Sequence, residues 1–257
     1  MEIEGHDFPE ALRLLAGRAG VVLKREDPRL RSERNRLYDV CEAAAGFFEK
    51  NLALTPAVLQ YVGARGILPA TAKEFRIGFA PKSWDTLLKF LQGQGFSADD
   101  AEKAGLVIRS EDKQSIYDRF RGRIMFPIFD ASGRVIGFGG RIFEVDKSQK
   151  EKIEAKYINT PQTLIYDKSK GLYGFDKAKQ DIRVAGHAVV VEGYMDCVMS
   201  HQAGVKNTIA VSGTAFTPQQ LGIIKRIADT MIFSFDADAA GESATRRRPT
   251  TSPRRRS

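Results

Sequence analysis

The stretch AVVVEGYMD at residues 188–196, together with MIFSFDADAAG at residues 231–241, decides the fold class. Each opens with a short apolar run rich in β-branched or aromatic side chains, which is typical of a buried strand. Each run ends on carboxylates, Glu192 after the first and Asp236 and Asp238 after the second. The interval between the two runs has room for a helix, a strand and a second helix. The pattern therefore predicts a βαβαβ unit with a parallel sheet.

These carboxylates are expected to lie at one edge of the predicted sheet. The carboxyl ends of parallel strands meet at the same edge, where ligands of α/β proteins bind. Asp236 and Asp238 are two positions apart, so their side chains point the same way on an extended chain. Carboxylates gathered there would repel one another unless a cation joined them, and hard oxygen ligands suit Mg²⁺ or Mn²⁺. A lone Asp-x-Asp after a strand is more often a solvated turn, so it is the combined pattern that favours a metal site.

The composition is that of an ordinary soluble globular protein. The 257 residues suffice for one large domain or two modest ones, and 42% of them are hydrophobic and 28% charged. No apolar run reaches membrane-spanning length and no signal-peptide pattern opens the chain, so we expect a cytoplasmic protein without membrane contact. Cys41 and Cys197 lie in apolar helical patterns. They indicate core residues in a reducing compartment, and neither a disulfide nor a zinc site.

The net charge of +8 comes mostly from the end of the chain. Residues 246–257 carry six arginines and no acidic residue, and removing those six charges leaves +2. We expect this low-complexity tail to be disordered. It could bind phosphates non-specifically, and an altered or foreign ending is the simpler interpretation. A nucleic-acid partner must therefore be argued from local clusters.

The patterns divide the chain into four segments and predict an α+β subdomain followed by an α/β subdomain. Residues 1–36 hold a short amphipathic helix and a polar linker from Lys24 to Arg36. Residues 37–184 form a helical and mixed α/β subdomain. Residues 185–245 carry the βαβ pattern with its largely parallel sheet, and residues 246–257 are the tail.

Local signals place the elements inside these segments. Apolar spacing predicts a helix over residues 37–48, and Thr55-Pro56 predicts the start of another that ends at Gly66. Two strands, residues 124–128 and 134–138, are joined by the turn sequence DASG. The other helix signals are the candidate N-caps Ser83 and Ser97, the candidate stops Gly95 and Gly105, and a helix start at Gly174.

The histidines offer no catalytic arrangement. The predicted helix over residues 194–202 buries Val198 and leaves His201 near its end, where a surface or capping role is expected. His6 and His187 show no partner pattern. Nothing in the sequence supports a Ser/His/Asp or Cys/His site.

Basic residues, aromatic residues and glycines surround the predicted hairpin. Arginine and lysine pair with phosphate, aromatic rings stack on unpaired bases, and glycine lets a backbone approach a polyanion closely. The alternative is a basic edge strand whose charges prevent aggregation. The basic residues that carry the first interpretation are Arg119, Arg121, Arg141, Lys156 and Lys168.

The order of these motifs resembles two known families. The sequence VEGYMD at residues 191–196, followed by DADAAG, resembles the Toprim domain shared by bacterial primases and topoisomerases. The motifs YDRFR, MFPI, GRVIGFGGR, KYINTPQT and LYG, which run in order through residues 117–174, are similar to those of the bacterial replicative primase core. The resemblance covers roughly residues 1–245.

The resemblance implies an RNA polymerase that makes short primers on a single-stranded DNA template from ribonucleoside triphosphates, at the replisome in the nucleoid of a bacterial cell. It implies that Glu192 is a metal ligand or general base, that Asp236 and Asp238 hold Mg²⁺, and that Asp196 supports them. Arg65 either faces template or nucleotide or compensates the dipole of its helix. The other positions that match residues facing template and incoming nucleotide are Arg141, Lys156, Asn159 and Lys168.

The chain departs from that family at both ends. The family carries a zinc ribbon before this region, a Toprim domain that continues past DADAAG with further strands and another acidic pair, and a C-terminal domain that binds the replicative helicase. We therefore expect no zinc, a truncated Toprim domain with an uncovered sheet edge, and reduced or no activity. Two other classes stay open: a non-catalytic single-strand-binding fragment, and another Toprim enzyme such as a nuclease or topoisomerase.

Overall fold

The computed structural model of the protein describes residues 27–111, 115–143, 155–211 and 216–235. The chain divides into two compact units, residues 1–35 and residues 36–257. The described part of the first unit is the beginning of helix α2 (Pro28–Ala53), and the second unit contains the remaining elements.

Helix α2 is longer than its apolar spacing indicated. It begins at Pro28, so the interpretation of residues 28–36 as a linker is wrong. Proline suits the first helical position, and the arginine, glutamate and leucine residues that follow are strong helix formers. Because these first turns are polar, they lack the apolar periodicity on which the expectation rested. The short helix expected within residues 1–20 lies outside the described residues.

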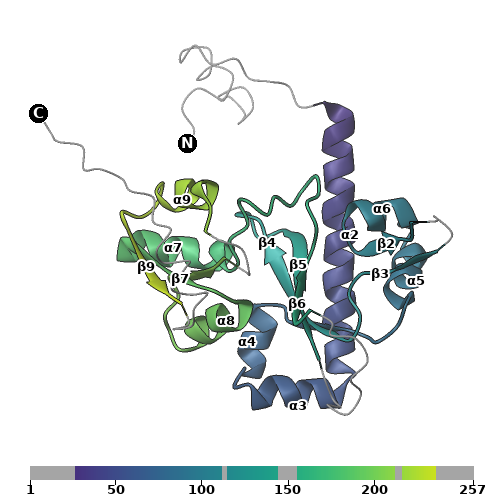
Figure 1. Ribbon diagram of the computed structural model, residues 1–257, viewed down its shortest axis with the longest axis horizontal. Helices are drawn as coiled ribbons and strands as arrows, with labels where there is room; N and C mark the ends of the chain where they lie inside the picture. Colours follow the sequence, from purple (N-terminus) through teal and green to yellow (C-terminus); the bar gives the residue numbers. More distant parts are fainter. Residues whose placement is uncertain (1–26, 112–114, 144–154, 212–215, 236–257) are drawn as a thin grey trace, which may run out of the picture. The chain divides into compact units, whose positions relative to one another are not determined.

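The predicted hairpin is confirmed and belongs to a four-stranded antiparallel sheet (Figure 1). Met125 on one strand of the hairpin faces Gly140 on the other. Asp130 closes the turn, because its Oδ1 accepts hydrogen bonds from the backbone nitrogens of Ser132 and Arg134 at 2.8 and 3.1 Å. The strands in sheet order are β1 (Gly78–Ala80), β4 (Arg123–Phe129), β5 (Val135–Ile142) and β6 (Tyr157–Asn159).

Short helices and a two-stranded sheet complete this part of the second unit. Phe48 on α2 and Phe138 on β5 are both buried, with ring centroids 5.3 Å apart, so the helix and the sheet share a hydrophobic core. The elements are α3 (Pro56–Ala64), α4 (Pro69–Glu74), α5 (Thr86–Gly93), α6 (Ala98–Lys103), β2 (Val107–Arg109) and β3 (Ile116–Asp118).

Most of the predicted helix ends are confirmed. Ser97 caps α6, with its Oγ accepting from the backbone nitrogen of Asp100 at 3.1 Å. Gly95 and Gly105, at φ +82° and +72°, follow their helices in the left-handed conformation that favours glycine. Ser83 is not an N-cap, because α5 starts two residues later than expected and Asp85 holds that position.

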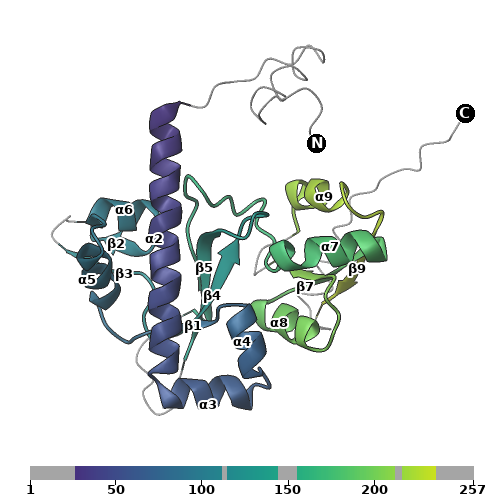
Figure 2. The ribbon, with the colours of Figure 1, turned by 180° about the vertical axis from the view of Figure 1, so that it is seen from behind.

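The second sheet is parallel and confirms the predicted βαβαβ unit. Its strand order is β8 (Thr208–Ala210), β7 (His187–Val191) and β9 (Thr230–Ser234). Helices α7 (Phe175–Ala185) and α8 (Tyr194–Gln202) lie on opposite sides of it in both views, and α9 (Pro218–Ile224) lies on the same side as α7 (Figures 1 and 2). Strand β7 is central and largely buried, whereas β9 is exposed along most of its length.

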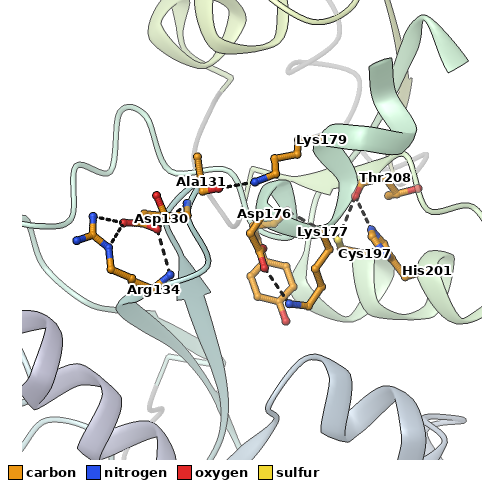
Figure 3. A network of polar contacts seen from close by, with 11 residues as sticks. Asp130, Ala131, Arg134, Asp176, Lys177, Lys179, Cys197, His201 and Thr208 are labelled. Carbon is orange, nitrogen blue, oxygen red and sulfur yellow. Dashed lines mark hydrogen bonds and ion pairs between the residues drawn. The ribbon is translucent and has the colours of Figure 1, made fainter. Parts of the chain in front are cut away.

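Polar contacts attach α7 to the hairpin turn and α8 to the neighbouring strand β8 (Figure 3). Lys179 donates to the backbone oxygen of Ala131 in the turn at 2.6 Å. His201 is buried, and its Nε2 lies 2.8 Å from the Thr208 oxygen, so the expectation of a surface or capping histidine is wrong. The ring of Phe75, the residue after α4, meets the His201 ring edge-on at 5.2 Å, a contact that no local sequence pattern indicates.

Both cysteines are buried and free, as predicted. Burial raises the pKa of the Cys41 thiol to about 12 and also raises the pKa of the Cys197 thiol, so both stay protonated near neutral pH. None of the described helices is long and apolar enough to cross a membrane.

Candidate active site

The end of strand β7 places Glu192 directly before helix α8. Val191 is the last residue of β7, and Glu192 and Gly193 lead into the helix. The parallel register sets Val191 beside Ser234 at the end of β9. The two strands therefore end at one edge of the sheet, where the sequence predicted the carboxylates. Asp236 and Asp238, the other two predicted catalytic residues and metal ligands, lie outside the described residues.

Asp196 has a local role in the structure. It is exposed in the first turn of α8, and its Oδ2 accepts from the backbone nitrogen of Gly193 at 3.1 Å. The bond satisfies one of the amide groups that a helix N-terminus leaves without an intrahelical partner. Within the described residues, no group of three or more histidine, cysteine, aspartate or glutamate side chains could hold a metal ion. The four-carboxylate metal site therefore stays a prediction, for which Glu192 and Asp196 supply oxygen donors of the right chemistry.

Helix α8 brings this strand end to the basic hairpin through its first residue, Tyr194. The Tyr194 hydroxyl donates to Oδ1 of Asn159 on β6 at 2.8 Å. The Tyr194 ring stacks on Phe126 of β4, with centroids 5.2 Å apart and planes 11° apart. A Cβ at Gly139 on β5 would lie 2.3 Å from that ring, so only glycine admits the tyrosine there. The carboxylate strand end and Asn159 are thus held on two sides of one buried side chain.

Arg141 lies on β5 and Lys156 directly precedes the neighbouring strand β6, and the surroundings of the two side chains differ. Arg141 is 7% exposed, faces Tyr157 in the β5–β6 register, and donates from Nη1 to the Tyr157 hydroxyl at 3.4 Å. Burial raises the pKa of Tyr157, and the Arg141 charge opposes that shift. Lys156, just before β6, is exposed. Of the two, the lysine can reach a polyanion without any change in the sheet.

Arg121 forms part of an exposed aromatic and cationic cluster. Its guanidinium lies 4.3 Å from the ring centroid of Trp84 and 5.3 Å from that of Tyr117. Trp84 is 64% exposed, an unusual position for so large an apolar side chain. Sequence reasoning did not name Trp84, although it is the single tryptophan of the chain and stands in the turn-forming sequence PKSWD. Arg119, by contrast, is half-buried, and burial lowers its pKa.

The last two predicted residues lie at the surface. Arg65 ends α3, exposed, with its guanidinium 5.2 Å from the ring centroid of Tyr61. The turn after Arg65 is hydrogen-bonded to Gln202, the last residue of α8. The Gln202 Nε2 donates to the Gly66 oxygen and its Oε1 accepts from the Leu68 nitrogen, both at 2.8 Å. Lys168 is also exposed. The alternative of a solvated surface cation stays open for both residues.

The comparisons with known proteins decide the family. The family profile described as "DNA primase catalytic core, N-terminal domain" matches residues 47–179, about half of the chain, and a Toprim domain profile matches residues 186–248. This chain belongs to the DNA primase catalytic-core family. The resemblance expected from the sequence is therefore confirmed, and so is the fold class.

The primase relatives are similar over nearly all of this chain. The DNA primase of Streptomyces coelicolor is 41% identical over 261 residues, which cover 96% of this chain and 40% of that protein. The RNA polymerase domain of Mycobacterium tuberculosis primase DnaG, in complex with double-stranded DNA, is 41% identical with a TM-score of 0.74, covering 82% of this chain and 67% of that one. A DnaG primase catalytic domain bound to single-stranded DNA is 36% identical with a TM-score of 0.73, covering 84% and 65%. The chain spans about 40% of the length of the curated relatives.

Within this primase core, the structure brings together Glu192, Asp196 and Asn159 around the start of α8, with Arg141 next to them through Tyr157. Asp196 and Tyr157 lie close enough for the Asp196 charge to contribute to the raised pKa of Tyr157, after the larger effect of burial. The sequence did not assign a role to Tyr194. The signal that could have found it is a tyrosine at the first position of a helix, opposite a hairpin strand rich in glycine.

Proposed function

We propose that this chain is the catalytic part of a DNA-dependent RNA polymerase that makes short RNA primers on single-stranded DNA. The observation that carries the proposal is the packing of the Glu192 strand end against the basic hairpin through Tyr194 and Asn159. Polar and cationic groups for a polyanion and a carboxylate for acid–base or metal chemistry then meet at one place. Relatives solved with bound DNA support the same assignment.

The proposed reaction is nucleotidyl transfer. The 3′-hydroxyl oxygen of the growing primer bonds to the α-phosphorus of a ribonucleoside triphosphate, pyrophosphate leaves, and the hydroxyl proton passes to a base. Positioning and charge neutralisation dominate such a reaction. Arg141 and Lys156 would bind phosphates, Asn159 would orient the nucleotide or template, and Glu192 would hold the metal or accept the proton. A bound Mg²⁺ or Mn²⁺, held by Glu192, Asp196, Asp236 and Asp238, would supply charge neutralisation at the phosphates.

The test is template-dependent primer synthesis with Mg²⁺, using ribonucleoside triphosphates and a single-stranded template. We expect Glu192→Gln to abolish synthesis while binding of a fluorescein-labelled single-stranded oligonucleotide persists, because the change removes one charge without altering shape. Asp181→Asn is the matched control, since it removes one exposed carboxylate from α7, away from the strand end. Near-normal synthesis by Glu192→Gln would show that Glu192 does not have this role.

A second candidate, a non-catalytic single-strand-binding module, is favoured by the Trp84–Arg121 cluster. An exposed tryptophan with an arginine stacked on it can hold unpaired bases without a metal. Oligonucleotide binding that is lost in Trp84→Ala, unaffected by Mg²⁺ and unaccompanied by synthesis would favour this candidate. The replicative helicase as a partner and a location at the replisome stay predictions.

A further inference from the structure

Helix α9 is hydrogen-bonded to the turn that carries Lys168. This turn, residues 167–171, belongs to the loop between β6 and α7. We propose that Thr217 and Gln220, at the N-terminus of α9, are positioning residues, which fix the turn so that the Lys168 ammonium group pairs with a phosphate of nucleotide or template. This inference rests on the proposed function, because it gives the two residues a role in the same reaction.

Both ends of the loop adjoin the candidate site. The loop begins directly after Asn159, the last residue of β6, whose Oδ1 accepts from the Tyr194 hydroxyl at 2.8 Å. Near the end of the loop, the Tyr173 ring meets the Tyr194 ring edge-on with centroids 4.7 Å apart. Tyr173 is also joined to Ala210 on β8 by two backbone hydrogen bonds, at 2.9 and 3.0 Å. The loop is therefore fixed at both ends beside the start of α8.

The middle of the loop is held by a capping box at the start of α9. The Gln220 backbone nitrogen donates to the Thr217 hydroxyl at 3.1 Å, and the Thr217 backbone nitrogen donates to Oε1 of Gln220 at 3.0 Å. Each side chain also donates to the turn. The Thr217 hydroxyl donates to the Ser169 backbone oxygen at 2.5 Å, and Nε2 of Gln220 donates to the Gly171 backbone oxygen at 2.6 Å. Gln220 is fully buried, so water does not compete for these bonds.

The two bonds from α9 act on a turn that contains two exposed lysines. Lys170 is paired with Asp167, with Nζ 2.8 Å from Oδ2. Lys168 is the residue that the sequence matched to a position facing nucleotide, and it is exposed. An ammonium group attracts phosphate as a point charge, so its effect depends on where the backbone places it. Loss of either bond from α9 should let the turn move and bring Lys168 less often to a phosphate.

A second capping box in the chain provides a matched control. At the start of α6, the Ser97 hydroxyl accepts from the Asp100 backbone nitrogen at 3.1 Å, and Oδ2 of Asp100 accepts from the Ser97 backbone nitrogen at 2.8 Å. Within the described residues, neither of these side chains is hydrogen-bonded to residues 167–171. Ser97→Ala therefore removes a helix cap of the same kind without changing the turn.

The experiment uses the full chain and compares the wild type with single variants and one double variant. Each is measured for thermal unfolding, hydrogen exchange of the amides of residues 168–171, the Kd of ATP, the Kd of a fluorescein-labelled single-stranded oligonucleotide, and kcat and KM for ribonucleoside triphosphate in primer synthesis. The variants are Thr217→Val, Thr217→Ser, Gln220→Met, Ser97→Ala, Lys168→Ala, and Thr217→Val combined with Lys168→Ala.

We expect the variants that lose a bond to the turn to differ from those that keep it. Thr217→Val and Gln220→Met should exchange the turn amides faster and weaken ATP binding, oligonucleotide binding or kcat/KM about fivefold, the size that loss of one hydrogen bond produces. Thr217→Ser retains the hydroxyl and should match the wild type. Ser97→Ala should lower the melting temperature and leave exchange at the turn and binding unchanged.

The double variant separates positioning from general stability. If Thr217 acts through Lys168, adding Thr217→Val to Lys168→Ala should cause no further loss of binding or kcat/KM. A further loss, wild-type function in Thr217→Val or in Lys168→Ala, or an equal loss in Ser97→Ala would each overturn the inference and leave the proposed function standing. A wild-type chain that binds neither ATP nor the oligonucleotide and makes no primers would overturn the proposed function itself, and the inference with it.

Discussion

At the scale of single residues, Asp118 shows how a buried carboxylate can organise a surface. It is 3% exposed, and its two oxygens accept from the backbone nitrogens of Leu87 and Leu88 at 2.8 and 3.0 Å. Asp118, the last residue of β3, thus caps the N-terminus of α5, and its own backbone nitrogen donates to the Trp84 backbone oxygen. This last bond fixes the backbone at Trp84, whose side chain is exposed.

Burial raises the pKa of Asp118 to about 6, and the two backbone donors only partly oppose that shift. In the unfolded chain an aspartate has a pKa of about 3.9. The folded state therefore binds more protons between these values, and the contribution of Asp118 to stability is fully present below the unfolded pKa and lost as pH rises through about 6. We expect Asp118→Asn to remove this part of the pH dependence. Urea unfolding from pH 4 to 7.5 would show it, and equal pH slopes in the variant and the wild type would contradict it.

At the scale of elements, α2 crosses β1 at a contact that only glycine permits. A Cβ at Gly78 would lie 2.5 Å from the Phe48 Cβ and 2.6 Å from the Phe48 carbonyl carbon, and helix backbone cannot move aside as a flexible side chain can. Gly46, two residues earlier in α2, is exposed and has nothing within 4 Å of its Cβ position. The same substitution is therefore expected to have opposite effects at Gly78, which lies in the close contact, and at Gly46, which does not.

We expect Gly78→Ala to lower the free energy of unfolding by about 1–3 kcal/mol through overpacking. Gly46→Ala should raise it by about 0.5–1 kcal/mol, because alanine is the better helix former. Chemical denaturation of the two variants beside the wild type measures both changes. Two changes of the same sign would show that the helix–strand contact is not as close as described.

The two hydrogen bonds from Gln202 of α8 to the turn after α3 give a second prediction at this scale. Gln202→Ala removes both hydrogen bonds to that turn, so the amide of Leu68 should exchange its hydrogen faster and stability should fall by about 0.5–1.5 kcal/mol. Gln180→Ala on the exposed side of α7 is the control and should change neither. Unchanged exchange at Leu68 in Gln202→Ala would mean that other contacts hold the turn.

The elements that the sequence predicted correctly share a physical signal. The hairpin and the parallel strands have the right length and β-branched or aromatic content, and the turn at Asp130 uses residues that close turns through their own side chains. The first turns of α2 lack such a signal because polar residues cover them. The burial of His201 was not predicted because it depends on Phe75, which follows α4, and on Thr208 of β8.

At the scale of the whole molecule, the sequence predicted where the candidate site lies in the fold, and it did not predict most of the side-chain contacts around that site. The strand end at Glu192 is predicted by one apolar run and the carboxylate that follows it. The parallel register confirms that β7 and β9 end at the same edge of the sheet. The contacts of Tyr194 and the Trp84–Arg121 cluster join segments distant in sequence, so no local spacing reveals them. Arg141 was expected at a basic surface and is instead 7% exposed, in register with Tyr157 on β6.

The parallel sheet ends, within the described residues, on an apolar edge at β9. Ile232 and Phe233 are 48% and 40% exposed, and β9 pairs with β7 on one side. An exposed edge strand with apolar side chains is a template for pairing with another chain.

We therefore expect the protein to self-associate as its concentration rises, and we expect Ile232→Lys to reduce that association because a charged edge resists pairing. Sedimentation velocity over a concentration series measures this. Val184→Lys on α7, at a residue that is 82% exposed, adds the same charge away from the edge and should not reduce it. A wild type that stays monomeric, or equal association in both variants, would show that β9 is not a pairing edge.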